Sequence, residues 1–248
     1  MKINLLSDIH LEHMAYDWHL SKTDCDLVAL AGDIGVGLKT YNWAIRESET
    51  LGVPILMLAG NHEYYTNDFT LVEQAKELVE GTNVHILEKD IFDFQEYKIF
   101  GTTLWTDFCL YGDAQQRLAM KTARDMMADF KLITYKGNTF TPEDSLEEHK
   151  KSINWLYNNL SSTGSNIVIT HHAPTYHASH PIYRGDMLTP SFVSDYEWFI
   201  LDRKPLVWAS GHSHYCYRKQ IGDTLCVSNT KGYPGEILNF DPELIIEV

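Results

Sequence analysis

The first residues whose types indicate chemistry are Asp8 and His10, which stand two positions apart after the apolar residues 3–6. A carboxylate and an imidazole placed together at the end of a buried strand are suited to bind a divalent metal ion. Residues of similar type follow later apolar runs: Asp33, Asn61, His62, His171, His172, His212 and His214. Oxygen and imidazole ligands without a thiolate favour Mn, Fe, Zn, Co or Ni over a structural cysteine-type zinc site.

Short apolar segments must position these side chains. They occupy residues 2–7, 26–31, 54–59, 166–170 and 206–210. Nearly uninterrupted apolar runs are typical of strands buried on both faces, and the helical periodicity of 38–51 and 68–80 between the first strands indicates an α/β fold. In open α/β sheets the ligand site lies beyond the carboxyl ends of the strands, so we expect the polar residues to converge at one edge.

The rest of the chain adds further predicted elements. Strands are predicted at 83–87 and 98–104, helices at 114–130 and from Pro142 to about 160, a short helix from Ser194 to about 201, a hairpin over 217–227 and a last hairpin formed by 237–240 and 244–248. Two of the helix starts rest on capping boxes, in which a Ser or Thr is followed three residues later by an acid. The turn of the first hairpin is predicted at Gly222-Asp223.

Composition restricts the class of protein. The chain has 248 residues, 44% of them hydrophobic, which fits a single domain over 1–248. Its formal net charge of −14 argues against general nucleic-acid binding and against binding to an anionic membrane surface, because both need Lys and Arg. A small phosphate ester held by metal ions remains compatible with this charge.

The cysteines predict a cellular location. Cys25, Cys109, Cys216 and Cys226 are scattered, with no C-x-x-C pair, no preceding signal peptide and no apolar run near the ~20 residues of a membrane span. We therefore expect free thiols in a cytoplasmic protein. A disulfide between Cys216 and Cys226 across a hairpin is an alternative that the spacing allows.

Five motifs in chain order carry a resemblance to a known family. The motifs are "SDIH" at residue 7, "GD" at 32, "GNHE" at 60, "THH" at 170 and "GHSH" at 211. In wording and order they resemble those of the calcineurin-like metallophosphoesterases, which hold two metal ions. The resemblance implies a four-layer α/β/β/α sandwich with two packed mixed β-sheets.

The resemblance also implies a role for each site residue. It gives one metal ion to Asp8, His10 and His214, and the other to Asn61, His171 and His212. Asp33 bridges the two ions, and His62 faces the substrate without being a ligand. At "THHAP" the spacing to the proline favours His171 as the ligand. His172 then supports a ligand or contacts the substrate.

The reaction implied is hydrolysis at two metal ions. A shared carboxylate holds two cations roughly 3.5–4 Å apart, and a hydroxide that bridges them attacks phosphorus in line with the leaving oxygen. A protonated His62 can donate a proton to the leaving oxygen. Residues 173–194 form a long loop after the His171 strand, in which Arg184 is a candidate for bidentate contact with the substrate phosphate. The alternative for Arg184 is a surface ion pair with Asp186.

The functional hypothesis is a phosphoesterase with two divalent metal ions that hydrolyses a small phosphomonoester or phosphodiester, with nucleotides included. A phosphoprotein phosphatase is an alternative, ranked lower because "GDIG" and "GNHEYY" lack the adjacent arginine of such enzymes. A non-catalytic metal-binding scaffold for protein partners is a second alternative. Relatives of that kind lose a ligand or the His of "GNH", whereas every such position is filled here.

Overall fold

Two large sheets form the centre of the molecule in the computed structural model, which describes residues 1–236 and 239–248. The strand order of the first sheet is β13-β1-β2-β3-β4, with β1 Lys2–Leu6, β2 Leu27–Leu30, β3 Ile55–Met57, β4 Val84–Ile86 and β13 Ile245–Glu247. Strands β1 to β4 are parallel, and β13 pairs antiparallel with β1. The carboxyl ends of β1, β2 and β3 therefore lie at one edge of the sheet.

The second sheet is also mixed. Its order is β11-β12-β10-β9-β6-β5, with β5 Asp90–Phe94, β6 Tyr97–Thr102, β9 Ser165–Thr170, β10 Val207–Ser210, β11 Tyr217–Ile221 and β12 Thr224–Ser228. The inner strands β6, β9, β10 and β12 are parallel, while β5 and β11 pair antiparallel at the edges. Strands β9 and β10, which precede the candidate histidines, are neighbours in the middle of this sheet.

The two sheets pack face to face. Leu5 and Leu27 of the first sheet share one buried cluster with Ile167 and Val207 of the second. Successive strand residues point to opposite faces, so the next residue of each strand faces a helix layer instead. Burial on both faces explains why these strands read as continuous apolar runs.

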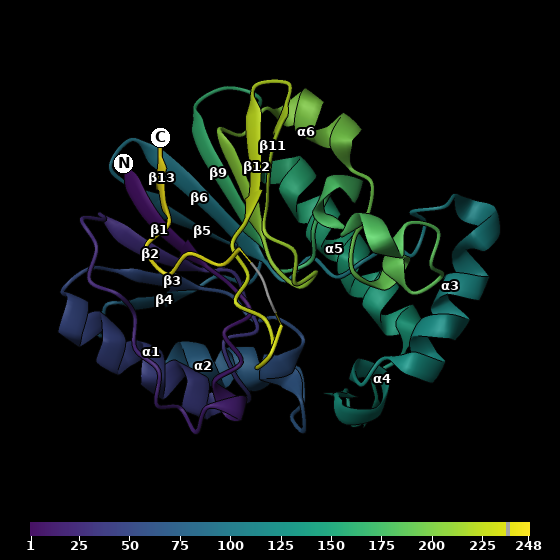
Figure 1. Cartoon of the computed structure of the whole chain (residues 1–248), viewed down its shortest axis with the longest axis horizontal. Coiled ribbons are helices and arrows are strands. Elements are labelled where there is room, and N and C mark those ends of the chain that lie inside the picture. Colours follow the sequence, from purple (N-terminus) through teal and green to yellow (C-terminus); the bar gives the residue numbers. More distant parts are fainter. Residues whose placement is uncertain (237–238) are drawn as a thin grey trace.

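Helices cover both outer faces of the sandwich (Figure 1). Helices α1 (Leu38–Leu51) and α2 (Leu71–Leu78) pack on the first sheet, where Trp43 and Val72 join Leu30 in one cluster. Helices α5 (Pro142–Asn159) and α6 (Glu197–Arg203) pack on the second, where Leu156 joins Trp208. The four-layer α/β/β/α sandwich expected from the sequence is confirmed.

The segment between β6 and β9 departs from prediction. The helix predicted at 114–130 is wrong at its end: α3 (Asp113–Met126) stops, Met127 is extended at φ −77°, ψ 139°, and a separate short helix α4 (Asp129–Leu132) follows. A two-residue ribbon of β7 (Thr134–Tyr135) and β8 (Asn138–Thr139) then leads to α5. In Figure 1, α3 and α4 lie beyond α5 at one end of the molecule.

The predicted caps and hairpins had mixed outcomes. The capping box that starts α5 is confirmed, because the Thr141 side chain accepts from Asp144 N and the Asp144 carboxylate accepts from Thr141 N. The box predicted at Ser194 is wrong: its hydroxyl accepts from Asp107 N, and α6 begins at Glu197. The hairpin of β11 and β12 is confirmed. In the predicted last hairpin, residues 237–238 lie outside the described residues, and β13 pairs with β1.

All four cysteines are free thiols, so the prediction without a disulfide is confirmed. Cys226 is buried, and the other three are partly exposed. Across residues 1–236 and 239–248, no helix combines the length and the apolar character that crossing a membrane requires.

Candidate metal centre and substrate cavity

The candidate ligands converge at the shared edge of the two sheets. Three ends of the first sheet and two ends of the second deliver them, namely Asp8 and His10 after β1, Asp33 after β2, Asn61 after β3, His171 after β9, and His212 and His214 after β10. All are buried except His214, whose side chain is 16% exposed. The structure thus brings all seven sequence-predicted ligands together.

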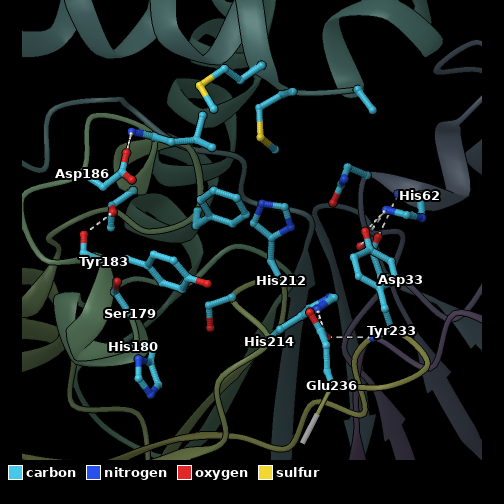
Figure 2. Close-up of a pocket in the computed structure, with 18 of the residues that line it drawn as sticks. Asp33, His62, Ser179, His180, Tyr183, Asp186, His212, His214, Tyr233 and Glu236 are labelled. Carbon is cyan, nitrogen blue, oxygen red and sulfur yellow. Dashed lines mark hydrogen bonds and ion pairs between the residues drawn. The ribbon is translucent and has the colours of Figure 1, made fainter. Parts of the chain in front are cut away.

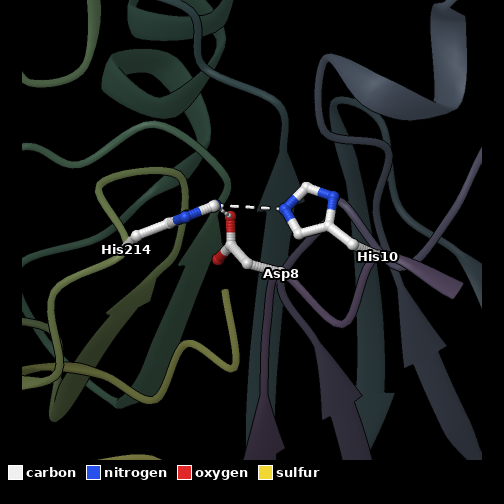
Figure 3. A group of neighbouring side chains, drawn as sticks. All are labelled: Asp8, His10 and His214. Carbon is white, nitrogen blue, oxygen red and sulfur yellow. Dashed lines mark hydrogen bonds and ion pairs between the residues drawn. The ribbon is translucent and has the colours of Figure 1, made fainter. Parts of the chain in front are cut away.

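One group of three candidate ligand atoms comes from the loops after β1 and β10. In Figure 3, His10 and His214 face each other with Asp8 beneath them. The Nε2 atoms of the two imidazoles are 3.0 Å apart, and His214 Nε2 is 3.5 Å from Asp8 Oδ1. The three ligand atoms lie within 4.8 Å of one another, which is compact enough to surround one cation.

A second group surrounds His171. Its Nε2 atom lies 3.0 Å from Asn61 Oδ1, 3.2 Å from His212 Nδ1 and 3.4 Å from Asp33 Oδ1. Asp33, His171 and His212 form another compact set of three ligand atoms, and the Asn61 amide oxygen adds a fourth. Oxygen and imidazole ligands are a set that first-row divalent metals accept.

The outer ring nitrogens show which atoms are free to bind a cation. His10 Nδ1 faces Glu12 Oε1 at 3.1 Å, and His214 Nδ1 faces Glu236 Oε2 at 2.7 Å. A carboxylate only accepts, so each Nδ1 carries the hydrogen and each Nε2 of a neutral ring keeps a lone pair. Two lone pairs and a carboxylate that point at one another require a cation between them. These residues therefore fit a metal ion.

The pKa values of His171 and His214 also indicate that this site attracts positive charge. Burial acts to lower the pKa of His171, but the Asp33 carboxylate outweighs it and raises the pKa to about 9. Burial likewise opposes ionisation of His214, and Asp8 raises its pKa to about 9. Without a metal ion, a proton supplies the positive charge that the clustered carboxylates and lone pairs need.

Asp33 belongs to the second group and also reaches the first, because its carboxylate lies within 4.8 Å of ligand atoms of His10 and His62. Its Oδ1 accepts a 2.8 Å hydrogen bond from the backbone N–H of His62, and Oδ2 is 3.9 Å from His62 Nε2. Burial acts to raise the pKa of Asp33, but His171 and His62 hold it well below its usual range. An ionised carboxylate in this position is placed to serve both groups.

Several candidate ligands have strained backbones. Asp8, His10, Asp33, His212 and His214 have φ between 45° and 65°, a left-handed region that residues other than glycine seldom adopt. Residues held in this region cluster at functional sites, where the surrounding structure fixes them.

Adjacent glycines allow the strand ends to approach. A Cβ atom on Gly60 would overlap Asp33 Oδ1, and one on Gly211 would overlap Ser7 Oγ. Only a residue without a side chain fits at either position, which explains the glycines of "GNHE" and "GHSH".

His62 lies beside the ligands on a short 3-10 helix, His62–Tyr64. Its Nδ1 is 2.9 Å from Glu12 Oε1, and its Nε2 is 3.0 Å from the Tyr233 hydroxyl. Burial lowers the pKa of His62, but Asp33 and Glu12 outweigh burial and raise it. Burial acts to raise the pKa of Glu12, but its contacts with His10 and His62 outweigh burial and bring that pKa down to about 2.

The structure separates the two predicted substrate-binding residues from the cavity. His172 is buried, its Nδ1 faces Thr103 O at 3.3 Å, and its ring packs 4.1 Å from that of His212. It therefore supports a candidate ligand from behind. Arg184 is exposed, with its guanidinium 6.0 Å from the Tyr176 ring, and is not among the described residues that line the cavity. Its predicted contact with phosphate has no support from this geometry.

A cavity of about 700 Å³ opens over the candidate ligands. Asp33, Asn61, His62, His212 and His214 form its floor, and Figure 2 shows Tyr183 and Asp186 on the side away from Asp33 and His62. The other described lining residues are Tyr65, Met126, Met127, Ala128, Ser179, His180, Ile182, Leu188, Thr189, Phe192, Ser213, Tyr233 and Glu236. Loop 173–194 thus contributes to the wall, as its length suggested.

Sequence reasoning missed the residues that hold the ligands. Glu12 contacts both His10 and His62, Glu236 contacts His214, and Asp129 of α4 accepts from Asn61 Nδ2 at 3.0 Å. None follows an apolar strand, so the pattern that identified the ligands gave no signal for them.

The α/β/β/α sandwich thus presents two groups of candidate metal ligands at the shared edge of its sheets. The family model for calcineurin-like phosphoesterases matches residues 1–216, and the chain belongs to this family. The family places it among enzymes that hydrolyse phosphoric ester bonds.

Individual relatives are distant. An uncharacterized protein of Acanthamoeba polyphaga mimivirus is 25% identical over 99% of this chain and 96% of its own. Phosphopantetheinyl hydrolase from Mycobacterium tuberculosis is similar in structure, with a TM-score of 0.72, 13% identity and coverage of 94% of this chain and 90% of that one. A protein of Thermus thermophilus has a TM-score of 0.52, 12% identity and coverage of 92% and 88%. At these identities the structural likeness shows the fold.

Proposed function

We propose that the chain is a phosphoesterase with two divalent metal ions that hydrolyses a small phosphoester. The observation that carries the proposal is two compact ligand groups at the floor of a cavity: one contains Asp33, and Asp33 also lies close to His10 of the other. Asp8, His10 and His214 would hold one ion, and Asn61, His171 and His212 the other. Bound divalent ions would activate water and offset the negative charge of the phosphoryl group.

Side chains beside the ions would position His62 and transfer a proton. Glu12 holds the Nδ1–H of His62, which directs Nε2 toward the cavity. A His62 ring protonated on both nitrogens would donate its Nε2 proton to the leaving oxygen. The Tyr233 hydroxyl now occupies that position at 3.0 Å, so the leaving oxygen takes its place when substrate binds.

Apart from the ions and His62, the cavity offers few cationic partners for the phosphoryl group. None of its described lining residues is Lys or Arg. The positive charge available to the phosphoryl group therefore comes from the ions and from His62. The same absence argues against a phosphoprotein phosphatase that grips phosphate with arginine beside the metals, and the filled ligand positions argue against a non-catalytic scaffold.

A metal-reconstitution screen tests the proposal. Protein stripped with a chelator is reloaded separately with Mn, Fe, Zn, Co or Ni, and its metal content is measured. Each form is then assayed against p-nitrophenyl phosphate, bis-p-nitrophenyl phosphate, nucleoside monophosphates, cyclic nucleotides and phosphopantetheine. We expect two equivalents of metal and metal-dependent hydrolysis. Absence of turnover on every ester with both equivalents bound would overturn the proposal.

A further inference from the structure

Part of the cavity wall is apolar, and it borders the candidate ligands at Phe192, whose ring stacks 4.8 Å from that of His212. We call this set the apolar wall: Met126 at the end of α3, Met127 and Ala128 after it, and Ile182, Tyr183, Leu188 and Phe192 of loop 173–194. Two distant parts of the chain build it, and both lie outside the strand ends that deliver the ligands. In Figure 2 the Tyr183 ring faces the same space as His212.

Part of this apolar wall faces solvent. Ile182, Tyr183 and Met126 are 74%, 56% and 63% exposed as whole residues. Exposed apolar side chains gathered at the mouth of a cavity are a feature of ligand sites, because covering them gains free energy. A substrate with an apolar group would remove them from water.

Two acids line the cavity beside the apolar wall, and Arg184 of loop 173–194 is not among the described lining residues. Asp186 and Glu236 line the cavity, and no Lys or Arg joins them among the described lining residues. Asp186 Oδ1 accepts from Leu188 N at 2.8 Å, and Glu236 Oε2 accepts from His214 and from Tyr233 N, so both are held in place. An anionic group brought here would lose water and meet like charge.

We propose that the apolar wall binds the leaving group of the substrate, and that this group is an uncharged, largely apolar alcohol without a second anionic group. This inference rests on the proposed function, which places the phosphoryl group at the candidate ligands. It narrows the substrate class to phosphoesters of apolar alcohols. It ranks nucleoside diphosphates, sugar bisphosphates and nucleic acids below them.

A matched pair of substrates tests the inference. Hexyl phosphate and hexane-1,6-diyl bisphosphate share one carbon chain and differ in a distal phosphate. We expect kcat/KM per ester to be higher for hexyl phosphate by about tenfold or more, since like-charge contact opposes the bisphosphate. From ethyl to hexyl phosphate, kcat/KM should rise by up to about fourfold per methylene covered, which corresponds to about 0.8 kcal/mol.

A charge variant and its control locate the effect. Ile182→Arg adds a cation to the apolar wall, and the exposed position of Ile182 makes the substitution compatible with folding. It should shift the preference toward the bisphosphate. Leu118→Arg adds the same charge at a 49% exposed position of α3 that does not line the cavity, and should leave the preference unchanged.

Equilibrium binding separates this inference from the proposed function. Hexylphosphonate and hexane-1,6-diyl bisphosphonate are titrated into metal-loaded protein by calorimetry. Tighter binding of hexylphosphonate, lost in Ile182→Arg, supports the inference even if no ester is hydrolysed, and that combination overturns only the proposed function. Equal or tighter binding of the bisphosphonate, or equal kcat/KM for the two esters, overturns the inference.

Discussion

The histidines of the site are oriented by hydrogen-bond partners outside the set of candidate ligands. Glu12 and Glu236 hold the outer nitrogens of His10 and His214, and Ala31 O accepts from His171 Nδ1 at 2.9 Å. Each contact fixes the tautomer, so the inner nitrogen presents a lone pair. The Glu63 carboxylate likewise accepts from four backbone N–H groups of the loops that carry Asp33 and Asn61, and keeps those loops together.

The shared carboxylate gives the first prediction. Asp33→Asn removes the negative charge between the two ligand groups, so we expect loss of both metal ions and of nearly all activity. Elemental analysis after gel filtration measures the metal content, and circular dichroism checks that the variant is folded. Two equivalents of metal retained by a folded Asp33→Asn protein would contradict the bridging assignment.

The adjacent histidines give the second prediction. His171→Ala removes a nitrogen that faces Asn61, His212 and Asp33, and should lose one metal equivalent. His172→Ala removes a ring behind His212 and should keep both ions, with a lower free energy of unfolding from the buried space that it leaves. Metal counts decide between the two, and the reverse pattern would make His172 the ligand.

His62 gives the third prediction. If its protonated Nε2 assists the leaving oxygen, His62→Asn should keep both metal ions and slow alkyl esters by about 10²–10⁴-fold. Aryl esters with acidic leaving groups should slow much less, since nitrophenolate needs little protonation. The measurement is log kcat/KM against leaving-group pKa for both proteins, with a steeper slope expected in the variant. Parallel lines would show that His62 only positions the phosphoryl group.

At the scale of elements, strand ends were predictable and helix ends near the site were not. Uninterrupted apolar runs located β1, β2, β3, β9 and β10, because burial on both faces leaves a strong signal. The break between α3 and α4 has no local signal, since residues 114–130 carry neither Gly nor Pro. The break allows α4 to present Asp129 to Asn61 and Tyr65, a contact made only in the folded protein.

Asp129 therefore gives a prediction for α4. Its buried carboxylate accepts from Asn61 Nδ2 at 3.0 Å and from the Tyr65 hydroxyl at 2.8 Å, which turns Asn61 Oδ1 toward His171. Asp129→Ala should weaken one metal ion by about 10–100-fold, the usual effect of losing a group that orients a ligand. Asp125→Ala removes an exposed acid near the end of the preceding helix α3 and is the matched control.

Chelator competition measures the affinity of each metal ion in these two variants. Asp129→Ala should lose affinity only for the ion held with Asn61, and Asp125→Ala for neither. Two unchanged affinities in a folded Asp129→Ala protein would show that Asn61 keeps its orientation without α4.

For the whole molecule, the sandwich joins residues far apart in sequence. The ligands come from both sheets, so the site forms only when the sheets pack together. The order of the motifs along the chain was enough to predict this architecture and the converging ligands. It could not predict the cavity wall, because the wall depends on how the segment before α4 and loop 173–194 fold onto each other.

His149 connects α5 with the segments that follow β6 and precede α6, and it gives a prediction for how stability depends on pH. On α5, its Nδ1 faces Leu104 O at 3.1 Å and Trp105 O at 3.2 Å, and its Nε2 is 2.8 Å from the Tyr196 hydroxyl. Burial lowers the pKa of His149, against a smaller opposing effect from Asp107. The folded protein therefore holds this ring neutral at pH values where the unfolded chain, with an ordinary pKa of about 6.5, takes up a proton.

The sign of the pH effect follows from that difference. The contribution of His149 to stability is complete above pH about 6.5 and falls as the pH drops toward the folded pKa, by at most about 1.4 kcal/mol per pH unit. His149→Gln does not titrate and should lack this slope. Urea unfolding of both proteins between pH 7 and 5 measures it, and the difference between them cancels the other titrating groups. A wild-type free energy of unfolding that falls no faster than that of His149→Gln would show that His149 is not held neutral by the fold.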